Sequence, residues 1–227
     1  MNDYEKALIE FLLPMVNESR LKMLDSVLVN RTRWLTVILE DIYQPHNASA
    51  VLRTCDCYGI QDVHIIENQN SYKINPQVEL GAAQWLTLHK YNKADSNTYD
   101  AISKIKEMGY SVIATSPHKN DVNLDDFDVT ASRTAIILGT EKQGLSDVAM
   151  EMADGFIRIP MLGFTESFNI SVSAAIILHQ LSNDLRKSSV NWHLSTDEME
   201  KIRFQWLKNS VNKIQAIEKG FKKQFYR

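Results

Sequence analysis

The chain has 227 residues, with 25 Lys and Arg against 28 Asp and Glu, and therefore a net charge of −3 at pH 7. A hydrophobic content of 44% and a charged content of 23% are those of a soluble globular protein with one domain plus appendages, or with two small domains. We expect no membrane span, because no apolar run is long enough to cross a bilayer, and the overall charge gives no sign of nucleic-acid binding.

The N-terminal segment and the two cysteines are typical of a protein from a reducing compartment. The first residues include acids, so they do not resemble a signal peptide. Cys55 and Cys57 lie two positions apart on a predicted helix and point to different sides, which disfavours a disulfide. No other cysteine can complete a zinc site, and the six histidines lack metal-ligand spacing. We therefore expect a cytoplasmic protein without a bound metal.

Apolar positions recur at helical spacing over residues 4–29, with a break at Pro14, and predict a helical extension over residues 1–33. Residues 34–187 then alternate between short apolar runs and helical patterns, which predicts one domain. Its strands are expected at residues 35–39, 63–66, 85–88, 110–115, 134–138 and 156–159. Its helices are expected at residues 48–58, 98–108, 146–153 and 171–185. Nearly continuous apolar strands between helices indicate an α/β fold, with a mostly parallel sheet covered by helices on both faces.

The C-terminal segment, residues 188–227, differs from the rest in charge. Residues 188–195 predict a linker, and residues 196–223 predict one or two helices. From Lys201 onward eight basic residues stand against a single acid, Glu218, so the overall charge hides a basic tail.

The first candidate site is the segment QPHNASAVLRT, which directly follows the first predicted strand. His46 or Asn47 is expected to cap a helix that begins at Ala48, because Pro45 disfavours helix before it. Within that helix, Arg53 is either a solvated surface residue or a contact for a phosphate or a reacting hydroxyl. Six residues at about 100° each put Asn47 and Arg53 roughly 120° apart. If both serve catalysis, we expect a second subunit to complete the site.

Three polar loops follow three of the predicted strands, and their sequences are ATSPHKND, ILGTEKQGLS and RIPMLGFTESFNISVSAAI. The second loop is not a P-loop, because Gly144 is followed by Leu145 rather than by Lys and Ser or Thr. The carboxyl ends of parallel strands meet at one edge of a sheet, where nucleotide-like ligands bind. Each loop alone is consistent with an ordinary turn. The coincidence of three favours a ligand site.

These segments together resemble the signature motifs of the SpoU family, within the SPOUT superfamily of RNA methyltransferases. The pattern N-x-x-A-x-x-R-T is present from Asn47 to Thr54, and G-x-E-x-x-G is present from Gly139 to Gly144. The resemblance covers residues 34–186, with the motifs in the order that the family requires.

The third family pattern, I-P-M-x-G-x-x-x-S-L-N-V-S-V-A, appears here as IPMLGFTESFNISVSA. Two positions differ, because Phe168 stands where Leu is usual and Ile170 where Val is usual. Both replacements keep the apolar character of the position.

The resemblance implies a homodimer that transfers a methyl group from S-adenosylmethionine to a ribose 2′-hydroxyl of RNA, with sites near the dimer interface. It also implies a deep trefoil knot in the C-terminal part of the sheet. By this likeness the three loops hold the cofactor, through Thr115, Ser116, Pro117, Leu138, Gly139, Gly144, Ile159, Met161, Phe168 and Asn169. The catalytic residue would be Arg53, in a site shaped by Asn47, Glu141, Ser167 and Asn169.

The chemistry agrees with this resemblance. A ribose hydroxyl is a poor nucleophile at neutral pH, so its proton must leave as it attacks. Free Arg is a very weak base, since its pKa is above about 12. Arg53 could act with the RNA phosphate as the base, or it could hold the phosphate and stabilise a developing alkoxide. A sulfonium cofactor needs no metal.

The flanking segments resemble the TrmH group of the family, which methylates a D-loop guanosine of tRNA. The basic tail would contact the tRNA backbone through Lys208, Lys213 and Lys222, and the alternative is a solvated pair of amphipathic helices. Three other functions stay open: methylation of ribosomal RNA or of another tRNA position, an RNA-binding module without catalysis, and a nucleotide-binding metabolic enzyme. The last is disfavoured by the absence of a dinucleotide fingerprint.

Overall fold

A computed structural model of the chain describes residues 1–72, 75, 78, 80–115, 121–140 and 143–226. The chain divides into two compact units. The terminal unit joins Met1–Arg31 to His193–Arg227, and the sheet unit is Thr32–Trp192. The two ends of the chain therefore fold together as one body.

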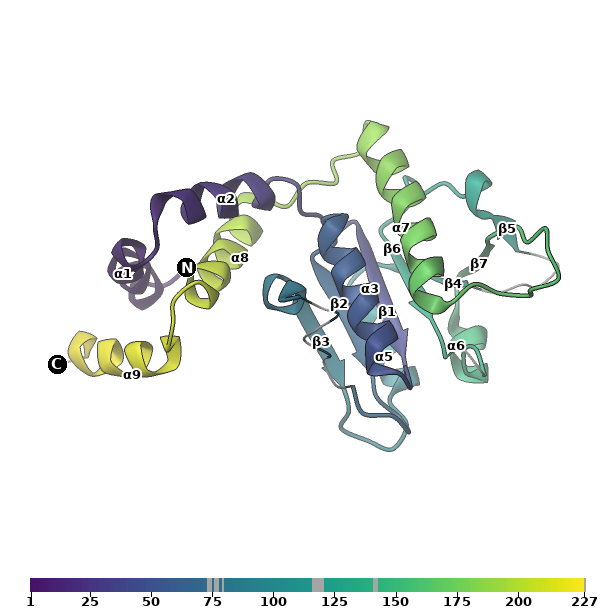
Figure 1. The fold of residues 1–227 in the computed structure, drawn as a ribbon, viewed down its shortest axis with the longest axis horizontal. Coiled ribbons are helices and arrows are strands. Elements are labelled where there is room, and N and C mark those ends of the chain that lie inside the picture. The colour runs from purple at the N-terminus through teal and green to yellow at the C-terminus, as the bar shows by residue number, and fades with distance from the viewer. Residues whose placement is uncertain (73–74, 76–77, 79, 116–120, 141–142, 227) are drawn as a thin grey trace. The chain divides into compact units, whose positions relative to one another are not determined.

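The sheet unit is built on a seven-stranded sheet in the order β3-β2-β1-β6-β4-β7-β5 (Figure 1). All described pairs of neighbouring strands are parallel. The strands are β1 (Leu35–Glu40), β2 (Asp62–Ile66), β3 (Thr87–Tyr91), β4 (Ser111–Thr115), β5 (Val122–Asn123), β6 (Thr134–Leu138) and β7 (Gly155–Arg158). The predicted mostly parallel sheet is confirmed, and five of the six predicted strands are found within one residue of their expected ends.

Helices cover both faces of the sheet, as predicted. They are α3 (Pro45–Cys57), α5 (Thr98–Glu107), α6 (Asp147–Met152) and α7 (Ile170–Lys187). Alternate side chains of β1 point to opposite faces. Val37 packs in one apolar cluster with α3 and α7, whereas Ile38 packs in the other cluster with α5 and α6. Burial on both sides explains why the central strands read as continuous apolar runs.

The strand predicted at residues 85–88 is wrong in position. Ala82–Trp85 forms a 3-10 helix, and β3 begins only at Thr87. This edge strand is mostly half-buried, and it carries polar residues at several positions, so no continuous apolar run marks it. The sequence also gave no sign of β5, which has only two residues and is followed by the 3-10 helix Leu124–Asp126.

The expected cap of α3 is also wrong. The helix begins at Pro45, and Gln44 is the non-helical residue before it. Proline suits the first position of a helix, because the missing N–H has no partner there and its φ is already helical. Asn47 is therefore inside the first turn, where its side chain is 2% exposed.

The terminal unit consists of four helices. They are α1 (Asp3–Leu12), α2 (Glu18–Leu28), α8 (Thr196–Asn209) and α9 (Ile214–Phe225). The predicted break at Pro14 is a 3-10 turn, Leu13–Met15. Apolar side chains from both ends of the chain form its core, namely Leu8, Leu12, Val16, Leu207 and Val211.

Two contacts of charged side chains connect α8 to the N-terminal segment within this unit. Arg203 donates its Nε–H to Asp25 at 2.6 Å. The guanidinium of Arg31 lies 5.0 Å from the ring centre of Trp206, which is 2% exposed. A buried cation over an aromatic face stabilises the contact by about 2 kcal/mol. Trp206 is therefore a packing residue and is too buried to stack on a base.

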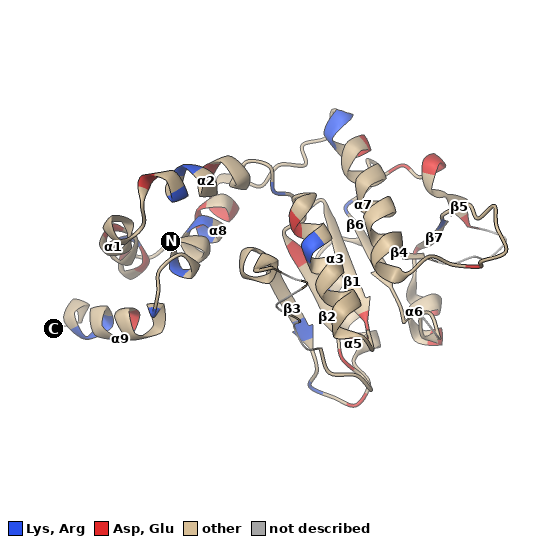
Figure 2. Ribbon diagram, in the orientation of Figure 1, with Lys and Arg blue, Asp and Glu red and all other residues tan. Residues whose placement is uncertain are grey.

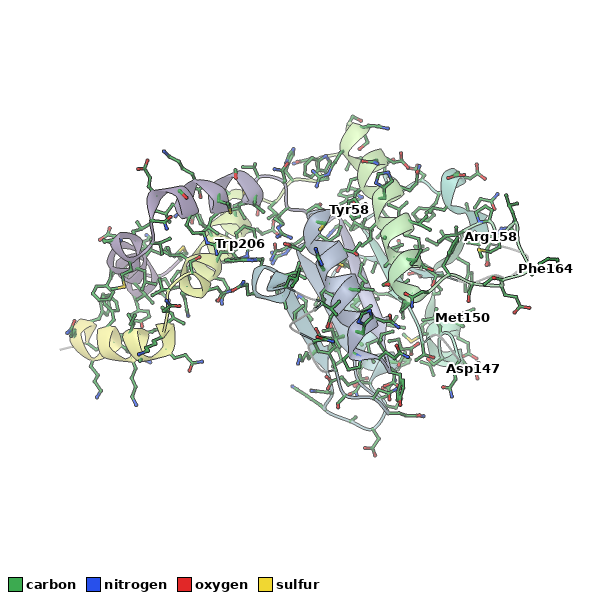
Figure 3. The ribbon with its side chains drawn as sticks, in the orientation of Figure 1. Tyr58, Asp147, Met150, Arg158, Phe164 and Trp206 are labelled. Carbon is green, nitrogen blue, oxygen red and sulfur yellow. The ribbon has the colours of Figure 1, made fainter. Side chains whose placement is uncertain are left out.

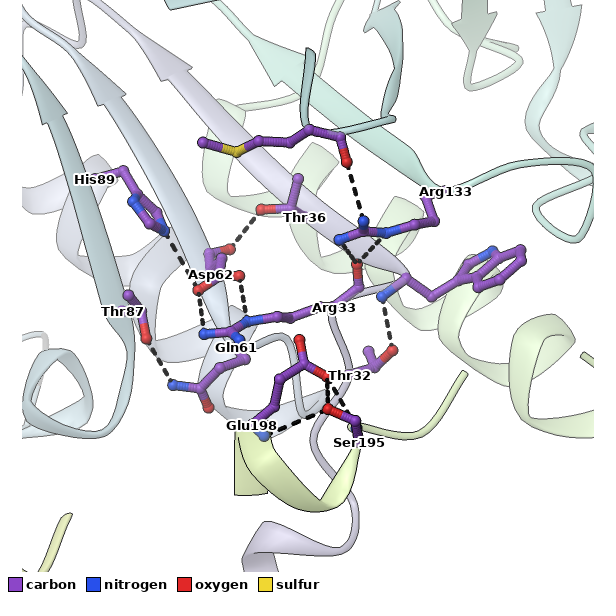
Figure 4. Close-up of polar contacts among 12 residues, drawn as sticks. Thr32, Arg33, Thr36, Gln61, Asp62, Thr87, His89, Arg133, Ser195 and Glu198 are labelled. Carbon is purple, nitrogen blue, oxygen red and sulfur yellow. Dashed lines mark hydrogen bonds and ion pairs between the residues drawn. The ribbon is translucent and has the colours of Figure 1, made fainter. Parts of the chain in front are cut away.

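A polar network closes the amino edge of the sheet, opposite the loops of interest (Figure 4). Arg33 donates its Nε–H to Asp62 at 2.7 Å, and His89 contacts the same carboxylate at 3.4 Å. Burial alone would raise the pKa of Asp62, but the His89 hydrogen bond and the Arg33 charge outweigh it and lower the pKa. Arg133 donates to the Tyr110 hydroxyl at 2.6 Å. These pairs satisfy the polar groups where the strands begin.

His64 is the least compensated titratable group near this network. Its ring is 1% exposed and stacks on His89 with centroids 4.7 Å apart. Its Nδ1 lies 3.0 Å from the Tyr91 hydroxyl, whereas its buried Nε2 has no hydrogen-bond partner among the described residues. Burial, with a smaller contribution from His89, lowers the pKa of His64 to about 4.

We predict that His64→Phe makes the stability of the protein less sensitive to acid. The pKa of His64 is about 4 in the folded chain and about 6.5 in the unfolded chain, so the unfolded state binds the proton first. Stability is full above about pH 6.5 and falls by up to about 3 kcal/mol as pH drops toward 4. The variant should lose this part of the slope in denaturant unfolding measured from pH 7 to 4.

The exposed residue His46 offers a matched control, since His46→Phe removes a histidine without removing a buried ring. Its unfolding curves should keep the pH slope of the wild type. A His64→Phe protein with an unchanged slope would show that this histidine does not control acid stability.

Candidate active site

A cavity of about 730 Å³ lies at the carboxyl ends of the strands β4, β7 and β5. This volume is within the range of small-molecule and cofactor sites. Its lining combines apolar groups with a few polar ones, including Thr115, Asn123, Ile157, Arg158, Ile159, Met161, Ser167, Phe168, Ser173 and Ile177. We call it the strand-end cavity. It brings together Thr115, Ile159, Met161, Ser167 and Phe168, five of the residues that the sequence singles out.

Asn169 connects the third loop to the start of α3. Its side chain caps α7, accepting from the Ser171 N–H at 2.8 Å. Its side-chain Nδ2 also donates to the side-chain Oδ1 of Asn47 at 3.3 Å. The two asparagines thus hold the amino ends of α3 and α7 together, and Asn47 is too buried to face a ligand freely.

Arg53 lies in a different place. It is exposed and lines a separate hollow of about 340 Å³ together with Thr54, Tyr58 and Ala175. No residue belongs to both linings. We call this second space the Arg53 hollow.

Helix α7 separates the two spaces. Ser173 and Ile177 line the strand-end cavity and lie four residues apart, on one side of the helix. Ala175 lines the Arg53 hollow and is rotated by about 200° from them around the axis. Within one chain, Arg53 therefore does not face the strand-end cavity. The angular separation expected from the sequence concerned Asn47 and Arg53, of which the first is buried and the second exposed.

The second loop is shaped by a close approach of two glycines. The N–H of Thr140 donates to the Gly144 carbonyl at 2.9 Å, and Gly144 donates back at 3.0 Å. A Cβ on Gly139 would lie 2.3 Å from the Gly144 carbonyl oxygen, which no side chain tolerates. Gly144 has a φ of +71°, a conformation that costs a residue with a side chain about 1 kcal/mol.

A buried carboxylate, which the sequence did not single out, holds the end of this loop. Glu40, at the end of β1, is 3% exposed. It accepts from the hydroxyls of Ser146 at 2.6 Å and Thr98 at 2.7 Å, and from the Ser146 N–H at 2.9 Å. Ser146 in turn caps α6 by accepting from the Ala149 N–H.

The other predicted site residues have varied positions. Leu138 is buried at the end of β6 and is absent from the cavity lining. Ser116, Pro117 and Glu141 lie outside the described residues. Within the described ranges, no cluster of three or more His, Cys, Asp or Glu side chains could hold a metal ion. Over the same ranges, no helix has both the length and the apolar character that a membrane span needs.

The strand-end cavity also contains polar residues that the sequence did not single out. Arg158 donates its Nε–H to the Asn123 side-chain oxygen at 2.9 Å, across the pairing of β5 with β7. Figure 3 shows Arg158 beside β7 and Phe164 farther out on the loop. The strand β5 is too short to leave a pattern, so this pair could be found only once the register was known.

The lysines of the tail differ in their surroundings. Lys208 forms an ion pair with Glu218 at 3.0 Å and lies over the ring of Phe204. Lys213 and Lys222 are exposed. Lysine and arginine recur along α8 and α9 (Figure 2). Of these three residues, Lys213 and Lys222 are available for a polyanion without the loss of an internal contact.

The residues of the strand-end cavity suit an adenosyl cofactor that carries an amino-acid group. Ile159, Met161 and Phe168 supply apolar surface for a purine ring. Thr115 and Ser167 supply hydroxyl groups, and Arg158 supplies a positive charge. The volume and the donor set therefore fit S-adenosylmethionine.

Comparison with known proteins agrees with this geometry. The profile of the family described as "SpoU rRNA Methylase family" matches residues 34–179. The chain is 39% identical, over 96% of its length and 98% of the relative's, to a tRNA (guanosine(18)-2'-O)-methyltransferase of Borreliella burgdorferi. The crystal structure of an Aquifex aeolicus TrmH/SpoU tRNA modifying enzyme is 32% identical and superposes with a TM-score of 0.77, covering 86% of this chain and 98% of that one.

A more distant structure shares the fold alone. It is an AdoMet-bound rRNA methyltransferase from Sinorhizobium meliloti, 21% identical, with a TM-score of 0.59 over 69% of this chain and 58% of that one.

We predict that Gly139→Ala destabilises the sheet unit by more than about 2 kcal/mol, because the new methyl group would overlap the backbone of the loop. Denaturant unfolding measures the change. Gly163→Ala is the matched control, since the nearest atom to its Cβ would be 4.0 Å away. If both variants unfold at the same denaturant concentration, the close approach of Gly139 to Gly144 is not required.

Proposed function

Because this chain belongs to the SpoU rRNA methylase family, we propose that it is an S-adenosylmethionine-dependent RNA 2′-O-methyltransferase that methylates guanosine 18 in the D loop of tRNA. The observation that carries the choice of substrate is the match over 96% of the chain to a relative with that activity. It includes the terminal unit as well as the sheet unit. Methylation of ribosomal RNA is the alternative.

In this proposal the strand-end cavity holds the cofactor through Thr115, Ile159, Met161 and Phe168. Ser116 and Pro117, which lie outside the described residues, are further contacts that the family resemblance implies. The backbone around Leu138, Gly139 and Gly144 forms the adjacent wall. The cofactor supplies an electrophilic methyl group on a positively charged sulfur. The task of the protein is then to align a ribose oxygen with that methyl group and to exclude water.

Arg53 acts on the nucleophile. Its guanidinium holds an RNA phosphate next to the reacting ribose and stabilises the negative charge that develops on the 2′-oxygen as its proton leaves. This role needs a permanent cation and suits the exposed position of Arg53. Asn47 and Asn169 position the helix that carries Arg53, through their mutual hydrogen bond. Ser167 and Glu141 shape the ribose side of the site.

A second copy of the chain completes each site. In support, α7 separates Arg53 from the strand-end cavity of the same chain. Large apolar side chains also lie exposed around the third loop and the start of α7. They are Leu162 and Phe164, which are fully exposed, and Phe168 and Val172, which are more than 40% exposed. Such apolar surface is typical of a protein interface. We propose a homodimer in which Arg53 of one subunit serves the cavity of the other.

The terminal unit grips the tRNA backbone. We assign the phosphate contacts to the exposed Lys213 and Lys222, because Lys208 is engaged by Glu218. The predicted division into an extension over 1–33, a catalytic domain over 34–187 and a tail over 188–227 is part of the same proposal, as are the trefoil knot and a place in the cytoplasm. No metal is needed.

We predict that the protein transfers labelled methyl groups to a tRNA transcript and not to ribosomal RNA. A transcript in which 2′-deoxyguanosine replaces guanosine 18 tests the position, because it lacks only the accepting hydroxyl. It should bind as well as the normal transcript and accept no label. Label in ribosomal RNA alone, or equal label in both transcripts, would contradict the proposed substrate.

We predict that two inactive variants restore each other. Arg53→Ala should lower transfer at least about 100-fold, because charge stabilisation is lost. Met161→Trp, which fills the strand-end cavity, should also be inactive. Subunits mixed at equal amounts should recover about a quarter of the wild-type activity, since half of the dimers are mixed and each holds one intact site.

The mixture distinguishes sites shared between subunits from sites within one subunit. If Arg53 serves the cavity of its own chain, no mixed dimer has an intact site and the mixture stays inactive. Each variant mixed with wild-type protein is the control for subunit exchange.

A further inference from the structure

Arg158 is a charged residue of the strand-end cavity to which the proposed mechanism gives no task. It ends β7, where Figure 3 labels it. Its side chain is exposed, and it lines the cavity together with Ile157 and Ile159. Asn123, directly across the β5–β7 pairing, accepts from its Nε–H at 2.9 Å. This hydrogen bond fixes the guanidinium at its inner nitrogen and restricts the rotation of the side chain.

The outer edge of the guanidinium remains available. Among the described residues, no carboxylate forms an ion pair with Arg158, and the Nε–H is the only group of its guanidinium with a hydrogen-bond partner. The two terminal nitrogens form a fork that matches the two oxygens of a carboxylate. A guanidinium that is already held at its Nε is partly preorganised for such a ligand, because less side-chain entropy remains to be lost on binding.

The cofactor proposed for this cavity has such a group. S-adenosylmethionine carries an adenosine part and an amino-acid part that ends in a carboxylate and an ammonium. The apolar residues Ile159, Met161 and Phe168 suit the purine and can offer nothing to a carboxylate. A carboxylate forms its strongest hydrogen bonds with a cationic partner, and Arg158 is the one arginine or lysine in the described lining.

We propose that Arg158 binds the carboxylate of the cofactor's amino-acid part and that Asn123 is the positioning residue that orients it. This rests on the proposed function only in the identity of the cofactor. An RNA phosphate is a second anion that an exposed arginine could contact. The position of Arg158 within the lining of the cavity favours the cofactor, and the experiment below separates the two.

The test compares two ligands by isothermal titration calorimetry on the full-length protein. One is S-adenosylhomocysteine, and the other is its analogue that lacks only the carboxylate. For Arg158→Met we expect the dissociation constant of S-adenosylhomocysteine to rise about tenfold, the lower end for a charged hydrogen bond, because the site is open to solvent. The dissociation constant of the analogue should change less than about twofold, so the variant should no longer distinguish the two ligands.

Two further variants sharpen the outcome. Asn123→Ala should raise the dissociation constant of S-adenosylhomocysteine by a smaller factor and leave that of the analogue unchanged. The charge of Arg158 remains in this variant, but its guanidinium is less well oriented. Lys187→Met removes an exposed charge at the end of α7 and should change neither dissociation constant. The analogue also reports on folding, because a misfolded cavity would lose both ligands.

Three results would overturn the proposal. An equal rise in both dissociation constants would show that Arg158 supports the structure of the cavity and does not contact the carboxylate. Unchanged binding of both would remove Arg158 from cofactor recognition. Unchanged binding of both with weaker tRNA binding would assign it to RNA. Failure of the proposed function would give a different result. Wild-type protein would still bind S-adenosylhomocysteine more tightly than the analogue, and Arg158→Met would lose this difference, but the protein would methylate no tRNA.

Discussion

The buried carboxylate of Glu40 holds together the edge of the sheet on which the site depends. A carboxylate that is removed from water is costly unless donors surround it. Here the first turn of α5 and the cap of α6 supply those donors, through Thr98 and Ser146. Three segments that are distant in sequence thereby meet at the end of β1. Glu40 thereby anchors Ser146, which follows the close approach of Gly139 to Gly144 in the chain.

Helix α7 lies between the strand-end cavity and the Arg53 hollow. The strand-end cavity has the shape and groups that suit a cofactor, and the Arg53 hollow has the cation that suits an RNA phosphate. Helix α7 contributes to both spaces from opposite sides. Its cap, Asn169, is bonded to Asn47 of the helix that carries Arg53. Within one chain this helix therefore lies between the two spaces, which the proposed homodimer would bring together from different subunits.

The sequence was informative where burial forces a pattern. The strands β1 and β6 are covered on both faces and appear as uninterrupted apolar runs, so the parallel sheet could be predicted. The parallel arrangement in turn predicted that the polar loops meet at one edge, and helical geometry predicted that Asn47 and Arg53 point apart. The position of the edge strand β3 was predicted wrongly, because a partly exposed strand can carry polar residues and then has no continuous apolar run.

The pairing of Asn123 with Arg158 lay beyond sequence reasoning for a different reason. It arises from the register of a two-residue strand against a partner 35 positions away. Neither residue type nor spacing encodes such a contact. The bond between Glu40 and Ser146, 106 positions apart, is of the same kind. Long-range polar contacts of this sort depend on the completed fold.

The mixed origin of the terminal unit has a consequence for how the protein is made. Its apolar core draws on Leu8 and Leu12 from one end of the chain and on Leu207 and Val211 from the other. During synthesis α1 and α2 leave the ribosome long before α8 exists, and their apolar faces then have no partner. The sheet unit, by contrast, has all its strands once Arg158 has emerged. The apolar core of the terminal unit can therefore be completed only after α8 has been synthesised.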